Sequence, residues 1–426
     1  MRDSNRWMGV LSVSAGLLLA ASAWTEDWPQ WRGLNRDGLS KETGLLKEWP
    51  KEGPNLLWQF NDLGSGYATP SVSGGRIYLI SNKGLEDEFV NALDVRDGKN
   101  VWSTRIGKVG NPDQKPNFPA ARSTPTVDGA VLYALGSDGD LVCLVSATGK
   151  VRWHRSLRSD FGGLPGTWAY AESPLVDGDV LACVPGGKDS TIVALDKRSG
   201  EVIWKSPVPG GDMAGYASMV IANTGSIKQY IAYTAGGLLG VDAKTGKFLW
   251  RYEKTKGSMG MSIQTPVVRD GYVYSGAGRV GGGAVRLNAV QGNVTAEEAY
   301  FDPKLPTAIG GAVLVGDYLY GSSQTVMCVE YKTGQIKWNE RSIAPASLCY
   351  AEGLLYLHGE GGDIALIEAT RDAYRERGRF TPPNQPTHNN AMEKAWPYPV
   401  VANGRLYIRD LGTLWCYDIR AAEAAK

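Results

Sequence analysis

Residues 92–102 read ALDVRDGKNVW, and the same eleven-residue phrase returns four more times along the chain. Close copies end at Trp204 and Trp250, and looser copies end at Trp153 and Trp338. Each copy has a small residue first, a glycine seventh and a tryptophan last. A unit of roughly 40–50 residues that repeats along a chain is typical of a propeller or a solenoid.

Each repeat divides into four short strands. The unit from residue 122 contains the runs RSTPTVDG, VLYALG, LVCLVS and VRWHRS, separated by turns rich in glycine and aspartate, which is the pattern of hairpin-linked strands. The long interval between Trp250 and Trp338 holds two units, with a weak copy around Gly292. We therefore predict an all-β, eight-bladed β-propeller. Its first strands should begin near Tyr67, Arg122, Tyr170, Tyr216, Ser262, Ala308, Ala346 and Tyr398.

The two ends of the chain complete one blade together in this interpretation. The last unit has three strands, and the missing outer strand is supplied by NLLWQF (55–60), with Trp58 at the usual place. Pairing the two ends closes the ring and hides two sheet edges.

The recurring tryptophans are predicted to be structural, because each large ring can pack against the neighbouring blade. The glycines of the phrase suit a left-handed position in the hairpin before each tryptophan. The tryptophans predicted to dock in this way are Trp58, Trp102, Trp153, Trp204, Trp250 and Trp338.

The eleven-residue pattern resembles the tryptophan-docking motif of the PQQ-like (quinoprotein-type) repeat propellers. That family includes PQQ-dependent alcohol dehydrogenases and BamB-like outer-membrane assembly factors. The leading DWPQWRGLNRDG (27–38) also resembles secreted PQQ-like repeat proteins of bacteria. We expect this segment to be an extended strap over the ring.

The N-terminus has the features of a Sec-type secretory signal. Arg2 and Arg6 precede an apolar run over 8–20, which is followed by Ala-Ser-Ala at 21–23. The run is too short to span a membrane comfortably, and no cysteine follows it for a lipid anchor. We expect a periplasmic or secreted protein divided into a signal peptide (1–23), an N-terminal strap (24–54), the propeller (55–420) and a C-terminal tail (421–426).

Composition excludes several classes of function. The chain has 45 basic and 44 acidic residues and no run of five Lys or Arg, so nucleic-acid binding is not expected. The five cysteines are odd in number and lie in apolar, strand-like runs, and Cys143, Cys328 and Cys416 take the same small-residue place in three repeats. We expect all five to be buried apolar residues.

The candidate binding residues lie on connections that share one face of the ring. Strand order places the outer-to-first connections and the second-to-third turns together, and the long ones are 104–121, 157–169, 206–215, 253–261 and 371–397. Aromatic residues with an arginine and a glutamine at a channel mouth could stack on and hydrogen-bond a ligand. The candidates are Tyr67, Arg122, Trp168, Tyr170, Tyr216, Gln264, His388 and Trp396.

The resemblance to PQQ dehydrogenases implies a vicinal disulfide, a calcium site and a catalytic aspartate, and the sequence does not match them. It has no vicinal cysteine pair, and we identify no calcium ligand cluster and no other metal site. The three histidines, His154, His358 and His388, lie in different repeats without metal-ligand spacing. We predict no catalytic residue and no cofactor, with PQQ and calcium only under the alternative below.

We therefore expect a non-catalytic binding or scaffold propeller that engages a protein or a cell-envelope ligand through its loop face. We also expect it to be a monomer without a membrane span. The alternative is a PQQ-dependent dehydrogenase with a reduced site, and a further alternative is an enzyme acting on polysaccharide. Fold alone does not choose among them.

Overall fold

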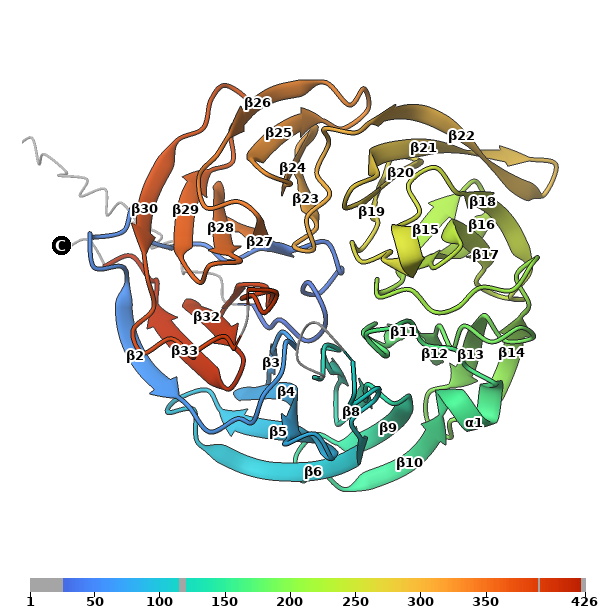
Figure 1. Ribbon diagram of the computed structural model, residues 1–426, viewed down its shortest axis with the longest axis horizontal. Coiled ribbons are helices and arrows are strands. Elements are labelled where there is room, and N and C mark those ends of the chain that lie inside the picture. Colours follow the sequence, from blue (N-terminus) through green and yellow to red (C-terminus); the bar gives the residue numbers. More distant parts are fainter. Residues whose placement is uncertain (1–25, 115–119, 390, 423–426) are drawn as a thin grey trace, which may run out of the picture.

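The chain folds into eight sheets, each with four antiparallel strands, arranged as blades around a central axis (Figure 1). The computed structural model describes residues 26–114, 120–389 and 391–422. The predicted all-β, eight-bladed propeller is confirmed, and the one α-helix in the described residues is α1 (Leu157–Phe161). The predicted signal peptide and most of the predicted C-terminal tail lie outside the described residues.

The strands of the first four blades run from the axis outward in chain order. Blade 1 consists of β3 (Ser71–Ser73), β4 (Arg76–Lys83), β5 (Asp87–Asp94) and β6 (Asn100–Lys108), and blade 2 consists of β7 (Thr126–Asp128), β8 (Val131–Leu135), β9 (Asp140–Val145) and β10 (Val151–Ser156). Blade 3 consists of β11 (Leu175–Asp177), β12 (Val180–Cys183), β13 (Ile192–Asp196) and β14 (Val202–Ser206), and blade 4 consists of β15 (Val220–Thr224), β16 (Ile227–Thr234), β17 (Gly237–Asp242) and β18 (Phe248–Tyr252).

The other four blades follow the same order, with additions from the N-terminal segment in blades 7 and 8. Blade 5 consists of β19 (Val267–Arg269), β20 (Tyr272–Ala277), β21 (Gly281–Val290) and β22 (Asn293–Asp302), and blade 6 consists of β23 (Ala312–Val315), β24 (Tyr318–Ser322), β25 (Val326–Glu330) and β26 (Ile336–Glu340). Blade 7 consists of β1 (Leu39–Ser40), β27 (Ala346–Ala351), β28 (Leu354–Gly359), β29 (Ile364–Glu368) and β30 (Glu376–Phe380), and blade 8 consists of β31 (Val400–Ala402), β32 (Arg405–Asp410), β33 (Thr413–Asp418) and β2 (Asn55–Phe60).

The ring closes as the sequence predicts. β2 pairs antiparallel with β33, and Trp58 faces Cys416 in the register. One blade therefore joins the two ends of the propeller, so opening the ring requires breaking a β-ladder as well as a blade interface.

Four of the five phrase tryptophans donate a hydrogen bond to the hairpin of the next blade, whereas Trp250 donates from Nε1 to Gln229 Oε1 of its own blade at 2.7 Å. Trp102 faces Ala92 within its own sheet, and its Nε1 donates to the carbonyl of Ser146 at 3.1 Å in blade 2. A Cβ placed on Gly149 would lie 2.5 Å from the Trp102 ring, so the glycine leaves room for the indole as well as taking a positive φ. Equivalent bonds to a neighbouring carbonyl are made by Trp58, Trp153, Trp204 and Trp338.

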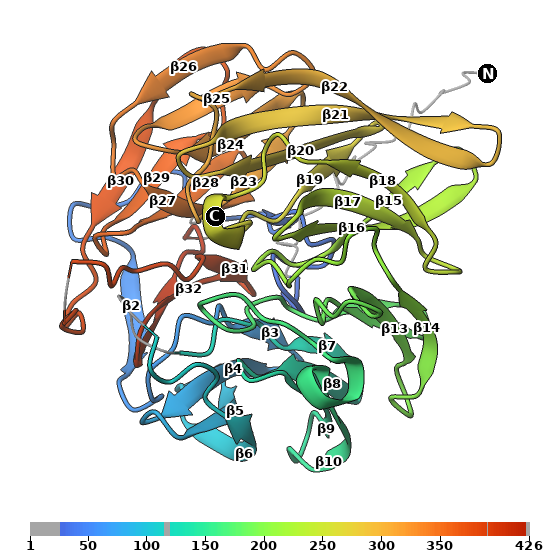
Figure 2. The same cartoon turned by 45° about the vertical axis from the view of Figure 1, so that its right-hand side comes forward.

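Blade 5 replaces the tryptophan with a tyrosine on a longer hairpin. Gly292 occupies the turn, with φ +75°, but β21 and β22 extend further than other hairpins (Figure 2). The residue facing Ala284 is Tyr300, whose hydroxyl donates to the Tyr331 carbonyl at 2.7 Å in blade 6. The weak copy predicted around Gly292 thus marks the turn, while the contact to the next blade comes from Tyr300.

Blade 7 corrects the prediction that 371–397 is one long loop, because the segment contains the outer strand β30. Gly378 faces Leu366, at the place where other blades carry tryptophan. Trp49 fills this site from the N-terminal segment, packing on Phe380 and Tyr356 with ring centroids 5.3 and 5.8 Å apart. The missing tryptophan concealed the strand from the sequence pattern.

The N-terminal segment that we predicted as an extended strap crosses the central axis, where its first part lies beside the inner strands of several blades (Figure 1). Trp28 pairs with Val72 of the innermost strand of blade 1, and β1 pairs in parallel with β27 of blade 7. Between these points, Arg32 bonds the Ala312 carbonyl of blade 6 and Arg36 bonds the Ser173 and Pro174 carbonyls before blade 3. We call residues 28–40 the plug.

Smaller differences concern loops and strand starts. The predicted loop 157–169 begins with α1, 253–261 includes a short 3-10 turn, η1 (Ser258–Gly260), and β6 extends into 104–121. Most inner strands begin later than expected, as with β7 at Thr126. All five cysteines are free and buried, which confirms their predicted place in the core. Within the described residues, no helix is long and apolar enough to cross a membrane.

Candidate functional site

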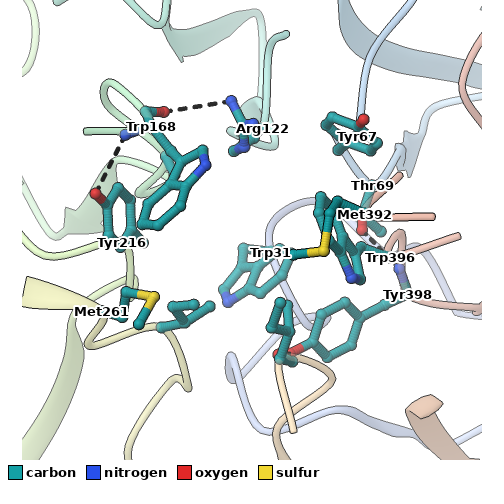
Figure 3. A pocket seen from close by; sticks show the side chains of 13 residues that line it. Trp31, Tyr67, Thr69, Arg122, Trp168, Tyr216, Met261, Met392, Trp396 and Tyr398 are labelled. Carbon is teal, nitrogen blue, oxygen red and sulfur yellow. Dashed lines mark hydrogen bonds between the residues drawn. The ribbon is translucent and has the colours of Figure 1, made fainter. Parts of the chain in front are cut away.

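A blind pocket opens on the predicted loop face at the axis of the ring, and it encloses about 230 Å³ (Figure 3). Its wall comes from the residues that precede the inner strands of several blades, and the plug forms its floor. The lining residues are Trp31, Tyr67, Thr69, Arg122, Trp168, Ala171, Tyr216, Met261, Ile263, Ile309, Met392, Trp396 and Tyr398.

The floor of the pocket is the indole of Trp31, at the centre of the plug. Its Nε1 donates to Thr265 Oγ1 at 2.8 Å, and its ring meets that of Tyr398 edge-on at 4.7 Å. These contacts join blades 5 and 8 across the channel. The pocket therefore depends on a segment that belongs to no single blade.

One wall is held by hydrogen bonds among Arg122, Trp168 and Tyr216. Arg122 Nη1 donates to the carbonyls of Ala120 at 2.7 Å and Trp168 at 3.3 Å. The Tyr216 hydroxyl accepts from the Trp168 backbone N–H at 3.2 Å, and the two aromatic rings lie 5.8 Å apart (Figure 3). Burial lowers the pKa of Arg122 and raises the pKa of Tyr216.

The opposite wall combines Tyr67 with the segment before β31. Trp396 packs on Tyr67 with ring centroids 4.9 Å apart, and the Arg122 guanidinium lies 5.2 Å from the centre of the Tyr67 ring. Thr69 Oγ1 accepts a hydrogen bond from the Tyr398 backbone N–H at 2.9 Å, which holds the segment before β31 against the segment before β3. Aromatic rings thus face the pocket from four blades and from the plug.

The structure brings five of the eight predicted residues together, namely Tyr67, Arg122, Trp168, Tyr216 and Trp396. The three others have different positions. Tyr170 is buried in the core, with its hydroxyl on the Pro185 carbonyl at 2.9 Å, and Gln264 is buried with its amide on the Ala308 carbonyl at 2.7 Å. His388 lies outside the lining and binds the Asp410 carboxylate at 3.0 Å. Position on the loop face therefore did not distinguish lining residues from packing residues.

Eight lining residues were not predicted from the sequence to contact a ligand, and Trp31 and Tyr398 are the two aromatic ones among them. Trp31 belongs to the segment 27–38, but its place at the floor depends on the plug entering the channel, which no local pattern indicates. Tyr398 was identified as the start of a strand, and its alignment with Tyr67, Tyr170 and Tyr216 in the repeats was an available signal.

The electrostatic character of the pocket does not suit PQQ with calcium. Among the lining residues that the structure describes, Arg122 is the one cation and none is an aspartate or glutamate. Nowhere in the described ranges do three His, Cys, Asp or Glu side chains gather as they would to hold a metal ion. PQQ is a tricarboxylate, and calcium needs several converging oxygen ligands. The residues present therefore do not fit this cofactor.

Large apolar side chains are exposed on the loops around the pocket. Leu164, Met213, Met259 and Met392 are 53%, 45%, 77% and 55% exposed. The connections of Leu164 and Met213 are joined by a bond from Ala214 N–H to the Leu164 carbonyl at 2.9 Å. Ala235 N–H donates to the Met213 carbonyl at 3.2 Å, and a Cβ on Gly260, next to Met259, would lie 3.1 Å from Ala235, so the connection of Met259 is a neighbour too. We call Leu164, Met213 and Met259 the apolar rim.

Comparison with known proteins agrees with this architecture. The family model described as "Outer membrane protein assembly factor BamB" matches residues 39–166 and 86–340. The chain belongs to this family of PQQ-like repeat propellers. BamB from Burkholderia pseudomallei (strain K96243) is 27% identical over 298 residues, which cover 59% of this chain and 71% of that protein.

Two solved structures show the same fold. BamB from Moraxella catarrhalis has a TM-score of 0.58 at 16% identity, covering 84% of this chain and 96% of the other. The quinohemoprotein alcohol dehydrogenase from Comamonas testosteroni has a TM-score of 0.66 at 14% identity, covering 95% and 82%. The chain spans 19%, 71%, 56% and 42% of the length of four curated relatives that it matches.

Proposed function

We propose that the protein is an exported, non-catalytic binding propeller that engages a partner protein of the cell envelope through the apolar rim. The observation that carries this proposal is the exposure of Leu164, Met213 and Met259 on adjoining loops of one face. Exposed apolar groups that lie together are typical of interaction sites, and flexible methionines adapt to the surface of a partner.

The family supports the same conclusion. The matching family model and the relative from Burkholderia pseudomallei are named for outer-membrane protein assembly. The pocket also lacks a carboxylate among its described lining residues. We propose that the protein works without PQQ, in the periplasm or after secretion.

The test uses photo-crosslinking from defined surface positions in bacteria that make the protein. Benzoylphenylalanine replaces Met213 or Met259 on the rim, and the control replaces Val290, which is 48% exposed at the end of β21. Third-to-outer turns lie on the face opposite the loop face, so position 290 reports contacts unrelated to the rim. Both rim positions should crosslink to one defined protein that is absent from the control.

Equal crosslinking products at all three positions, or none at the rim, would contradict the proposed docking face. Aspartate at position 213 or 259 provides a second readout, because a charge at the centre of an apolar contact should reduce co-purification of that same protein at least about tenfold. Both positions are surface sites, so these variants should fold normally.

A further inference from the structure

The pocket has one polar corner in an otherwise apolar wall. The corner consists of the Arg122 guanidinium and the indole N–H of Trp168. Figure 3 shows the Trp168 ring nitrogen on the side that faces Arg122. The bonds from Arg122 to the carbonyls of Ala120 and Trp168 fix the guanidinium beside this indole. Two kinds of hydrogen-bond donor are therefore held next to each other at the wall.

The indole N–H of Trp168 is buried and has no acceptor among the described residues. A buried donor without an acceptor is unfavourable, because it has lost its hydrogen bonds to water without replacement. An acceptor atom that enters at this corner would relieve that loss. A carboxylate is suited to the position, since its two oxygens can accept from an indole and a guanidinium at once.

The rest of the wall favours a flat apolar body. The rings of Trp31, Tyr67, Tyr216, Trp396 and Tyr398 lie around the space, together with Ile263 and Met261. Aromatic rings bind other rings by stacking or by edge contacts and provide few hydrogen bonds. A ligand rich in hydroxyl groups, such as a sugar, would leave most of those groups unsatisfied here.

The charge of the pocket lining favours a ligand with a negative charge. Arg122 is its one cation, and the described lining contains no carboxylate. The Glu88 carboxyl acts on Arg122 from outside the lining, where it is hydrogen-bonded to Ser137 and burial raises its pKa to about 7. The positively charged guanidinium would repel a ligand with an ammonium group, whereas it would attract a ligand with a single negative charge.

We propose that the pocket binds a small, flat aromatic monocarboxylate, with its ring among the aromatic side chains and its carboxylate at the Arg122–Trp168 corner. This ligand class differs from PQQ in charge and in needing no calcium. The inference goes beyond the proposed function, because partner docking uses the apolar rim and this site uses the pocket inside it.

The test compares 2-naphthoate with its uncharged isostere 2-naphthamide on the purified protein, by calorimetry and by quenching of tryptophan fluorescence. We expect one site for naphthoate and an affinity for naphthamide at least about tenfold lower, because the charge-assisted hydrogen bonds are lost. Tryptophan fluorescence should decrease in part, since three of the fourteen tryptophans line the site.

Two variants test whether Trp168 and Arg122 at the polar corner bind the carboxylate of the ligand. Trp168→Phe keeps an aromatic ring but removes the N–H, and should weaken naphthoate about fivefold while leaving naphthamide nearly unchanged. Arg122→Gln should reduce the affinity for naphthoate to the level of the affinity for naphthamide. The matched control is Tyr170→Phe, which alters a neighbouring aromatic residue whose hydroxyl bonds Pro185 outside the lining, and should change neither affinity.

Several results would overturn this assignment. They are equal affinities for naphthoate and naphthamide in the unaltered protein, binding of neither at millimolar concentration, or naphthoate binding unaffected by both corner variants. Calcium-dependent binding of PQQ that naphthoate cannot displace would also overturn it. The ligand comparison needs no substitution, so a variant that fails to fold leaves it intact. Met213→Asp on the rim should not alter naphthoate affinity, which separates failure of this site from failure of the docking face.

Discussion

The indole of Trp31 packs edge-on against the phenol ring of Tyr398, with centroids 4.7 Å apart and planes at 69°. This contact joins the plug to blade 8 at the floor of the pocket. It connects the stability of the ring to the shape of the binding site, because one side chain contributes to both.

Replacing Trp31 by alanine should lower the free energy of unfolding by about 3 kcal/mol, within the range for partly or fully buried tryptophans. The change removes the ring contact with Tyr398 and the hydrogen bond to Thr265. Urea denaturation followed by circular dichroism measures the loss. Trp31→Phe is the control and should cost less, since it retains a ring, whereas an alanine variant as stable as the original would show that the plug does not support the ring.

The role of the hairpin glycines is tested within one blade. Gly149 and Gly129 both have positive φ, at +70° and +59°, but a Cβ on Gly149 would meet the Trp102 ring whereas one on Gly129 would meet nothing within 4 Å. Gly129→Ala should cost about 1 kcal/mol from backbone strain alone. Gly149→Ala should cost about 1–3 kcal/mol more because of overpacking. Equal losses in thermal or urea denaturation would contradict the proposed packing.

Trp49 should be as important to blade 7 as the repeat tryptophans are to theirs. It is 5% exposed and packs where Gly378 leaves the outer strand without a large side chain. We expect Trp49→Ala to lower the free energy of unfolding by about 3–5 kcal/mol. Leu57→Ala, at a position 37% exposed on β2, is a control that should cost much less. A small effect at position 49 would mean that blade 7 is stable without this segment.

The pair His388–Asp410 should make stability depend on pH. The hydrogen bond from His388 to Asp410 raises the pKa of His388, so the folded protein holds this proton more tightly than the unfolded chain does. The stabilisation is fully present below about pH 6.5, the ordinary histidine pKa, and is lost as pH rises through the folded value.

His388→Asn should therefore lower the free energy of unfolding more at about pH 5.5 than at about pH 8.5. Urea denaturation at the two pH values gives the difference between variant and original. Burial lowers the pKa of His358, which contributes the opposite slope, but that residue is present in both proteins. A penalty that is the same at both pH values, or larger at the higher one, would contradict this direction of the pH dependence.

Repeats made most of the fold predictable from the sequence. The phrase ending at Trp102 and its copies set the blade count, and Trp58 in the NLLWQF run identified the closing strand. Both features are local patterns that recur, so they could be recognised without knowing the tertiary structure. Where the pattern changed, prediction failed: β30 has Gly378 in place of tryptophan, and its partner Trp49 comes from a distant part of the chain.

The site was predictable in part for the same reason. Tyr67, Arg122 and Tyr216 stand at equivalent places before inner strands, which a ring brings together. Tyr170 has the equivalent place but is buried, with its hydroxyl on the Pro185 carbonyl. The floor could not be predicted, because Trp31 reaches the axis through bonds that bind the plug to backbone carbonyls of several blades.

The most direct test of the central claim, that this propeller does not act as a quinoprotein, is calorimetric titration of PQQ into the purified protein with and without calcium. We predict no binding in either condition at high micromolar concentration, because the lining has one cation and, in the described residues, no calcium ligand set. Stoichiometric binding that requires calcium, with quinone absorbance retained after gel filtration, would contradict this claim and indicate an oxidoreductase.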